Sequence, residues 1–151
     1  MNSLPDTRRL LSFSERRQRR FEQVLMRTQQ QLQPLRQELA DFAEQAAALH
    51  NLLASHRAED CTLDHGQLLA LLRRQAIIRR QIHVLQLERD RVEQQCRQVD
   101  ETLQTQREQL RCARQKHDKY ERVVQQMTRA QKLERVRRED REVEDMAGVQ
   151  R

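Results

Sequence analysis

Apolar residues recur along two long stretches of the chain at alternating spacings of four and three residues. Nine of ten such positions are apolar between residues 21 and 53, and thirteen of seventeen are apolar between residues 71 and 127. A chain that is 36% hydrophobic would supply about ten apolar residues at these 27 positions, whereas 22 are found. A spacing that averages about 3.5 residues over this length predicts helices that supercoil with a left-handed twist around a partner helix.

A polar segment separates the two stretches and carries a helix-start pattern. Residues 55–66 read SHRAEDCTLDHG, in which Asp64 can act as an N-cap and Gln67 can reach back to it. A short connection between two amphipathic helices favours antiparallel neighbours. We therefore predict an all-α fold, a long antiparallel two-helix coiled-coil hairpin with unequal arms. The alternative is a parallel dimer of two such chains.

The chain is predicted to contain five segments, which are a flexible N-terminal segment (1–13), a first helix (14–55), a turn (56–64), a second helix (65–145) and a flexible tail (146–151). Pro34 lies inside the first helix and should kink it, because proline removes one backbone hydrogen bond. The alternative is a first helix that begins near Pro34.

The second predicted helix is longer than the first. If the chain folds back near residue 60, the N-terminal end of the first helix lies opposite Leu110 of the second. Seam residues beyond that point would lack an intramolecular partner, and they are Ala113, Tyr120, Val124 and Met127. An uncovered seam is a candidate docking surface for another protein. The alternative is a frayed or disordered end of the chain.

Composition supports long helices rather than a globular core. Charged residues make up 34% of the chain and aromatic residues 3%, and there are two glycines and two prolines. These glycines and prolines are too few for β-sheets, β-hairpins or glycine-rich phosphate loops. No stretch has the length and apolar character of a membrane span or a signal peptide. We expect a soluble cytoplasmic protein whose three cysteines are reduced thiols.

Basic residues gather near both ends of the chain, and the net charge is +6. Six arginines lie between residues 8 and 20 against Glu15 alone, and residues 107–141 hold twelve basic residues against six acidic ones. An antiparallel hairpin would bring these two segments together as one basic tip. Such a tip attracts an acidic protein surface or a phosphate backbone.

Four further arginines interrupt an apolar run that reads LLRRQAIIRRQI, residues 71–82. Arg74 and Arg79 flank the predicted seam, where their aliphatic stems can cover it. Arg73 and Arg80 point to the opposite side of the helix. They form either a solvated face or a contact with a partner.

Catalysis and metal binding are not predicted. Acidic residues occur along the helix faces, but a pair of helices offers no pocket that excludes water from a reaction. The histidines and cysteine around the turn, His50, His56, Cys61 and His65, lack a recognised ligand spacing. We therefore expect no catalytic, cofactor-binding or metal-binding residues. Arg89 and His117 interrupt the seam at some cost in stability.

Nucleic acid is the competing ligand for the basic ends. The sequence RRQRR followed by heptads is typical of a basic-leucine-zipper protein. Pro34 interrupts the supposed zipper, the basic segment is short, and aromatic residues that could stack on bases are almost absent.

Residues 52–88 resemble a known protein family and read LLASHRAEDCTLDHGQLLALLRRQAIIRRQIHVLQLE. They are similar to the central-stalk proteins of bacterial type III secretion systems, in the InvI/SpaM branch of the YscO family, which is related to flagellar FliJ. The matching elements are RAE before the turn, the leucine after it, LLRRQAIIRRQI and the following LQLE. The rest of the chain agrees in length, heptads and charge. Pro34 and the low aromatic content of the last third depart from the family pattern.

The resemblance implies a non-catalytic α-hairpin without a cofactor. Such a stalk inserts into the hexameric ring of the secretion ATPase, links it to the cytoplasmic domain of the export gate, and has export chaperones as further partners. The residues expected at the ATPase end are Arg16, Arg17, Arg19, Arg20, Tyr120, Arg122, Val124 and Met127. The end with Arg73, Arg74, Arg79 and Arg80 would face another part of the export apparatus.

Charge alone chooses this assignment of the two ends, and the inverted assignment stays open. Two other functions also stay open, a generic scaffold coiled coil and a basic nucleic-acid-binding helical protein. Monomer and dimer are not distinguished by the sequence.

Overall fold

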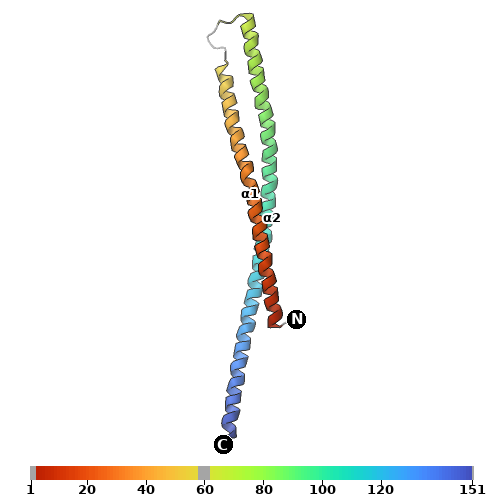
Figure 1. The fold of residues 1–151 in the computed structure, drawn as a ribbon, viewed down its shortest axis with the longest axis vertical. Coiled ribbons are helices and arrows are strands. Elements are labelled where there is room, and N and C mark those ends of the chain that lie inside the picture. Colours follow the sequence, from red (N-terminus) through yellow and green to blue (C-terminus); the bar gives the residue numbers. More distant parts are fainter. Residues whose placement is uncertain (1–2, 58–61, 151) are drawn as a thin grey trace. The chain divides into compact units, whose positions relative to one another are not determined.

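A computed structural model describes residues 3–57 and 62–150 of the chain. It contains two α-helices, α1 (Leu4–Ser55) and α2 (His65–Val149), and no strand within the described ranges (Figure 1). The all-α prediction is confirmed, and the packing between the helices is consistent with a hairpin. Helix α1 has 52 residues and α2 has 85.

Helix α1 begins at Leu4, ten residues before the predicted start at Ser14. Ser3 caps this end, since its Oγ accepts a hydrogen bond from the Asp6 backbone N–H at 3.3 Å. Thr7 and Ser14 are buried in the first stretch of α1, where they continue the four-and-three spacing. Because both residues are polar, a count of apolar residues does not detect that the spacing continues here. The segment expected to be flexible is therefore helical from Leu4 onward.

Helix α1 continues through Pro34 without ending. The carbonyl that loses its helical N–H donor belongs to Gln30, which is exposed, so water can bond to it. The alternative in which the first helix begins near Pro34 is wrong. The kink at this residue stays a prediction.

Helix α2 begins at His65, the residue predicted from the capping pattern. The Gln67 backbone N–H donates to Asp64 Oδ1 at 2.7 Å, and the Asp64 backbone N–H donates to Gln67 Oε1 at 3.2 Å. This reciprocal pair is a capping box, which satisfies two N–H groups at the helix start. The end of α1 is bound to α2 nearby, because Gln75 Nε2 donates to the His56 carbonyl at 2.7 Å.

Replacing Asp64 with alanine is expected to lower the free energy of unfolding by about 1 kcal/mol, because the cap of α2 is lost. Urea denaturation followed by circular dichroism measures this change. Thr62→Ala, two residues earlier and exposed, is the matched control and should change stability by less than about 0.5 kcal/mol. Equal effects of the two substitutions would show that the capping box does not stabilise α2.

The chain divides into two compact units, and each unit contains a segment of both helices. The first unit combines the chain up to Leu25 with the chain from Thr105 onward. The second unit runs from Met26 to Gln104 and contains the turn.

The core of the second unit lies at the positions predicted from the four-and-three spacing. Its buried apolar residues have exposed fractions of 3–9%, and they are Leu32, Ile78, Ile82, Leu85, Val92, Cys96 and Leu103. Arg89 also occupies a seam position, but its side chain is 47% exposed and forms ion pairs with Asp90 and Glu93 at 3.6 and 3.7 Å. Its guanidinium group thus lies in water while the residue occupies the seam.

The first unit has a core of its own. The four seam residues that were predicted to lack a partner are buried or half-buried in this unit. Ala113 is 6% exposed, and Tyr120, Val124 and Met127 are half-buried. The Thr7 hydroxyl donates a hydrogen bond to Met127 Sδ at 3.4 Å. The prediction that these residues have no intramolecular partner is wrong, because α1 starts ten residues earlier than expected.

Two polar side chains interrupt the core of the first unit. Within the described structure, Oε1 of Gln106 and Nδ1 of His117 are buried without a hydrogen-bond partner. Buried unpaired polar atoms of this kind reduce stability. From Arg129 to residue 150 every residue of the chain is exposed.

Candidate partner-binding surfaces

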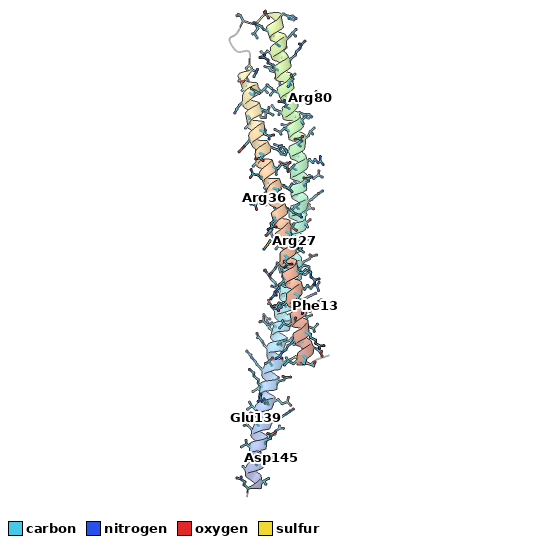
Figure 2. The ribbon with its side chains drawn as sticks, viewed as in Figure 1. Phe13, Arg27, Arg36, Arg80, Glu139 and Asp145 are labelled. Carbon is cyan, nitrogen blue, oxygen red and sulfur yellow. The ribbon has the colours of Figure 1, made fainter. Side chains whose placement is uncertain are left out.

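An N-terminal arginine cluster lies on α1 in the first unit, and it consists of Arg8, Arg9, Arg16, Arg17, Arg19 and Arg20. All six residues are exposed. Three of them line a shallow hollow of about 430 Å³ together with Ser12 and Phe13. Phe13, labelled in Figure 2, is 62% exposed. An aromatic ring beside arginines is a common feature of protein-binding surfaces.

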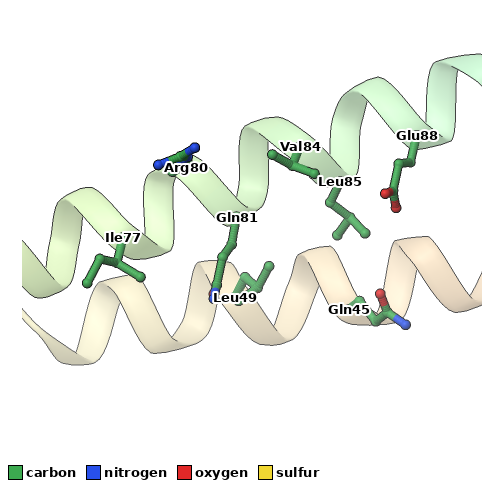
Figure 3. A pocket seen from close by; sticks show the side chains of 8 residues that line it. All are labelled: Gln45, Leu49, Ile77, Arg80, Gln81, Val84, Leu85 and Glu88. Carbon is green, nitrogen blue, oxygen red and sulfur yellow. The ribbon is translucent and has the colours of Figure 1, made fainter.

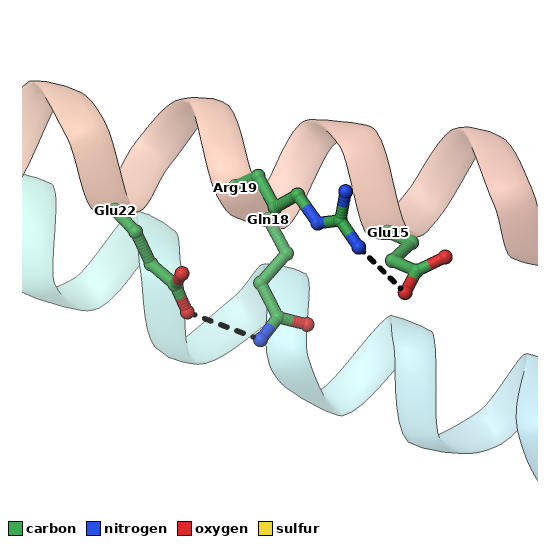
Figure 4. Close-up of polar contacts among 4 residues, drawn as sticks. All are labelled: Glu15, Gln18, Arg19 and Glu22. Atoms are coloured by element: carbon green, nitrogen blue, oxygen red, sulfur yellow. Dashed lines mark hydrogen bonds and ion pairs between the residues drawn. The ribbon is translucent and has the colours of Figure 1, made fainter.

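Few acidic residues neutralise this cluster. Arg19 Nη2 lies 3.2 Å from Glu15 Oε1, with side chains 71% and 54% exposed, so the pair contributes little to stability (Figure 4). Arg17 stacks over Phe21 at 5.6 Å from the ring centroid. Arg16 and Arg20 form no ion pair with any residue that the structure describes. Much of the positive charge is therefore available to a partner.

Glu22 connects α1 to α2 next to this cluster. Its Oε1 accepts a hydrogen bond from Gln18 Nε2 at 3.3 Å, shown in Figure 4, and one from Arg114 Nη2, also at 3.3 Å. The basic segments of α1 and α2 thus belong to the same unit, as the sequence predicted.

The other residues predicted at the ATPase end also lie in the first unit. Arg122 is exposed, whereas Tyr120, Val124 and Met127 are half-buried, and Met127 contacts Thr7 of α1. The four residues and the N-terminal arginine cluster are therefore part of one compact unit. A partner can reach Arg122 fully and the three seam residues only in part.

A second arginine group lies on α2 in the second unit and consists of Arg73, Arg74, Arg79 and Arg80. All four are exposed, and none forms an ion pair with a described residue. The reason lies in the sequence, because α2 contains no acidic residue between His65 and Leu87. This group is a second candidate surface for an acidic partner.

A groove in the second unit was missed by the sequence analysis (Figure 3). Its volume is about 470 Å³, and it is lined by Gln45 and Leu49 of α1 and by Ile77, Arg80, Gln81, Val84, Leu85 and Glu88 of α2. We call it the Ile77–Val84 groove. Ile77 is 59% exposed and Val84 45% exposed. The available signal was that each of them directly precedes a seam residue and that they are seven residues apart.

No metal site is found within the described residues, where no group of three histidine, cysteine, aspartate or glutamate residues could hold an ion. Cys61, considered as a ligand in the sequence analysis, lies outside the described residues. Cys96 is a buried free thiol and Cys112 an exposed one. Neither described helix is long and apolar enough to span a membrane.

Comparison with known proteins identifies one family for nearly the whole chain. Residues 5–147 match the model of a family described as Salmonella surface presentation of antigen gene type M protein. No curated protein and no solved structure matches the chain significantly. The match includes both arginine groups and the Ile77–Val84 groove.

Proposed function

The chain belongs to the family of Salmonella surface presentation of antigen type M proteins, which makes it a type III secretion-associated protein, and we propose that it is the non-catalytic central stalk of a type III secretion ATPase complex. In this role it inserts into the hexameric ATPase ring and links the ring to the cytoplasmic domain of the export gate. Export chaperones are further proposed partners. The proposed location is the cytoplasm, peripheral to the inner-membrane secretion apparatus.

The proposed fold is a long antiparallel coiled-coil hairpin with unequal arms. Two contacts in the first unit support opposite helix directions, since Glu22 contacts Arg114 and Thr7 contacts Met127. Thr7 precedes Glu22 in α1, whereas its partner Met127 follows Arg114 in α2, so the two helices run in opposite directions across these contacts. Buried positions that follow the four-and-three spacing support the coiled coil.

The observation that supports the stalk most directly is the concentration of unneutralised basic side chains in the first unit. We propose Arg16, Arg17, Arg19, Arg20, Tyr120, Arg122, Val124 and Met127 as the residues that contact the ATPase ring. Complementary charge accelerates association and fixes orientation, which a subunit entering a ring requires. The second arginine group then contacts another part of the export apparatus. The inverted assignment is the alternative, because charge alone makes this choice.

The proposed mechanism involves no chemistry by the chain. A single asymmetric chain inside a nearly symmetric hexamer contacts the six subunits unequally. Their conformational equilibria shift by the differences in contact free energy. This shift can promote ring assembly and nucleotide turnover.

The proposed function predicts that the chain changes the behaviour of the secretion ATPase. We expect faster ATP hydrolysis and a larger hexamer fraction when the purified chain is added to the ATPase of the same secretion system. A steady-state hydrolysis assay and analytical ultracentrifugation measure these two quantities. An unrelated helical protein of similar length and net charge is the control.

No change in hydrolysis or in hexamer fraction would contradict the stalk and favour a scaffold coiled coil. Retention of the chain on duplex DNA at physiological salt, without any effect on the ATPase, would favour a nucleic-acid-binding protein.

A further inference from the structure

The Ile77–Val84 groove combines half-exposed apolar side chains with polar ones. On α2, Ile77 and Val84 line it with Gln81 between them, and Leu85 lies beside Val84, while Leu49 lines it from α1 (Figure 3). Leu52, seven residues after Gln45 and therefore on the same face of α1, is 44% exposed. Single exposed apolar residues are ordinary, but several that line one groove together with a few polar side chains indicate a candidate interaction site.

The groove is positively charged at the end near Ile77 and Arg80. Arg80 lines the groove, and Arg73 and Arg74 lie one helical turn before Ile77 along α2. Residues 45–55 of α1 and residues 65–87 of α2 contain no aspartate or glutamate. Glu88 is the acidic residue among those that line the groove. Because these arginines have no ion partner among the described residues, the groove complements a negatively charged ligand.

The spacing of the apolar residues fits a helix. Ile77 and Val84 are seven residues apart, which is two helical turns or about 10.5 Å. An amphipathic helix repeats its apolar face with the same spacing, at positions i, i+3 or i+4, and i+7. A helix laid along the groove can therefore place one apolar residue against each of them.

We propose that the Ile77–Val84 groove binds an acidic amphipathic helix of a partner protein. The apolar face of that helix covers Ile77 and Val84, and its carboxylates meet Arg80, Arg73 and Arg74. This inference goes beyond the stalk function, which assigns no ligand chemistry to the groove, and it does not depend on that function.

Charge and chemistry disfavour two other occupants. A second copy of the chain would place the same unpaired arginines against one another, which opposes association. A nucleic acid would satisfy the arginines but would leave Ile77 and Val84 without apolar contacts, and no aromatic residue lines the groove for base stacking.

The test uses the full chain and a synthetic helical peptide of about 20 residues, with leucine on one face and glutamate on the other. Fluorescence anisotropy measures its affinity at physiological salt. We expect the double variant Ile77→Ser, Val84→Ser to bind about tenfold more weakly, because apolar contacts are lost. Arg80→Glu should weaken binding by a similar factor and reduce its salt dependence.

Two matched controls accompany these variants. Leu87→Ser removes an apolar side chain of α2 that is 58% exposed but does not line the groove, so its affinity should equal that of the unmodified chain. A peptide with lysine in place of glutamate, and one with its leucines scrambled around the helix, should not bind. Circular dichroism shows that each variant keeps its helices.

Three outcomes would overturn the proposal. One is equal affinity of the double variant and the unmodified chain for the acidic peptide. Another is self-association of the chain that the double variant abolishes, which would assign the groove to a second copy. The third is binding to duplex DNA or to anionic vesicles, but not to the peptide. The assay contains no ATPase, so its failure is distinct from failure of the stalk function.

Discussion

Reversing the charge of Arg16, Arg17, Arg19 and Arg20 to glutamate should weaken binding to the secretion ATPase by about a hundredfold at low salt. Exposed ion pairs each contribute a few tenths to 1 kcal/mol, so four lost contacts amount to about 2–3 kcal/mol. The remaining affinity should depend less on ionic strength, because fewer screened charge contacts are left. Titration of the ATPase at several salt concentrations measures both effects.

A second variant with the same change of charge serves as the control. Reversal of Arg73, Arg74, Arg79 and Arg80 alters four exposed arginines in the other unit of the chain. If the N-terminal arginine cluster contacts the ring, this variant should keep most of the affinity. The opposite ranking of the two variants would invert the assignment of the ends. Unchanged affinity and salt dependence in both variants would contradict a charge-based contact.

Replacing Ile78 with alanine is expected to lower the free energy of unfolding by about 2–4 kcal/mol. Ile78 is 5% exposed in the core of the second unit, and its truncation removes apolar burial and leaves a cavity. Urea denaturation followed by circular dichroism gives the change, and an unchanged m value shows that the unfolded state is unaffected.

The adjacent residue offers a matched control of the same residue type. Ile77 is 59% exposed, so Ile77→Ala should alter the free energy of unfolding by less than about 0.5 kcal/mol. Ile77→Ala should weaken binding of the acidic peptide in the groove. Ile78→Ala, under conditions in which the variant remains folded, should bind the peptide as the unmodified chain does. Equal destabilisation by both substitutions would mean that Ile78 is not part of a packed seam.

Much of the seam and one helix boundary were predictable because the signals are local. A repeat that averages about 3.5 residues requires only that one face of a helix be buried, so it located Ile78, Ile82 and Leu103 in the core. The capping box at Asp64 and Gln67 involves residues three positions apart. The acid-free run that leaves Arg73 and Arg80 unpaired is likewise visible in the sequence.

The start of α1 was not predictable from apolar residues alone. Thr7 and Ser14 are small enough to occupy the seam. The Thr7 hydroxyl lies within donor distance of two acceptors, the Ser3 carbonyl and Met127 Sδ. The second of these contacts joins residues 120 positions apart in the chain. For the same reason, the sequence alone did not show that α1 covers much of the seam around Met127.

The sequence by itself determined the all-α fold class, the apolar residues of the seam from Phe21 onward and the placement of the charges along the chain, since periodicity and capping act within a few turns of helix. The tertiary structure alone decided that Tyr120, Val124 and Met127 are half-covered and that Ile77 and Val84 line an open groove. Whether a side chain next to a seam is covered depends on which residues of the other helix lie opposite. That pairing is a contact between distant parts of the chain, and no local pattern encodes it.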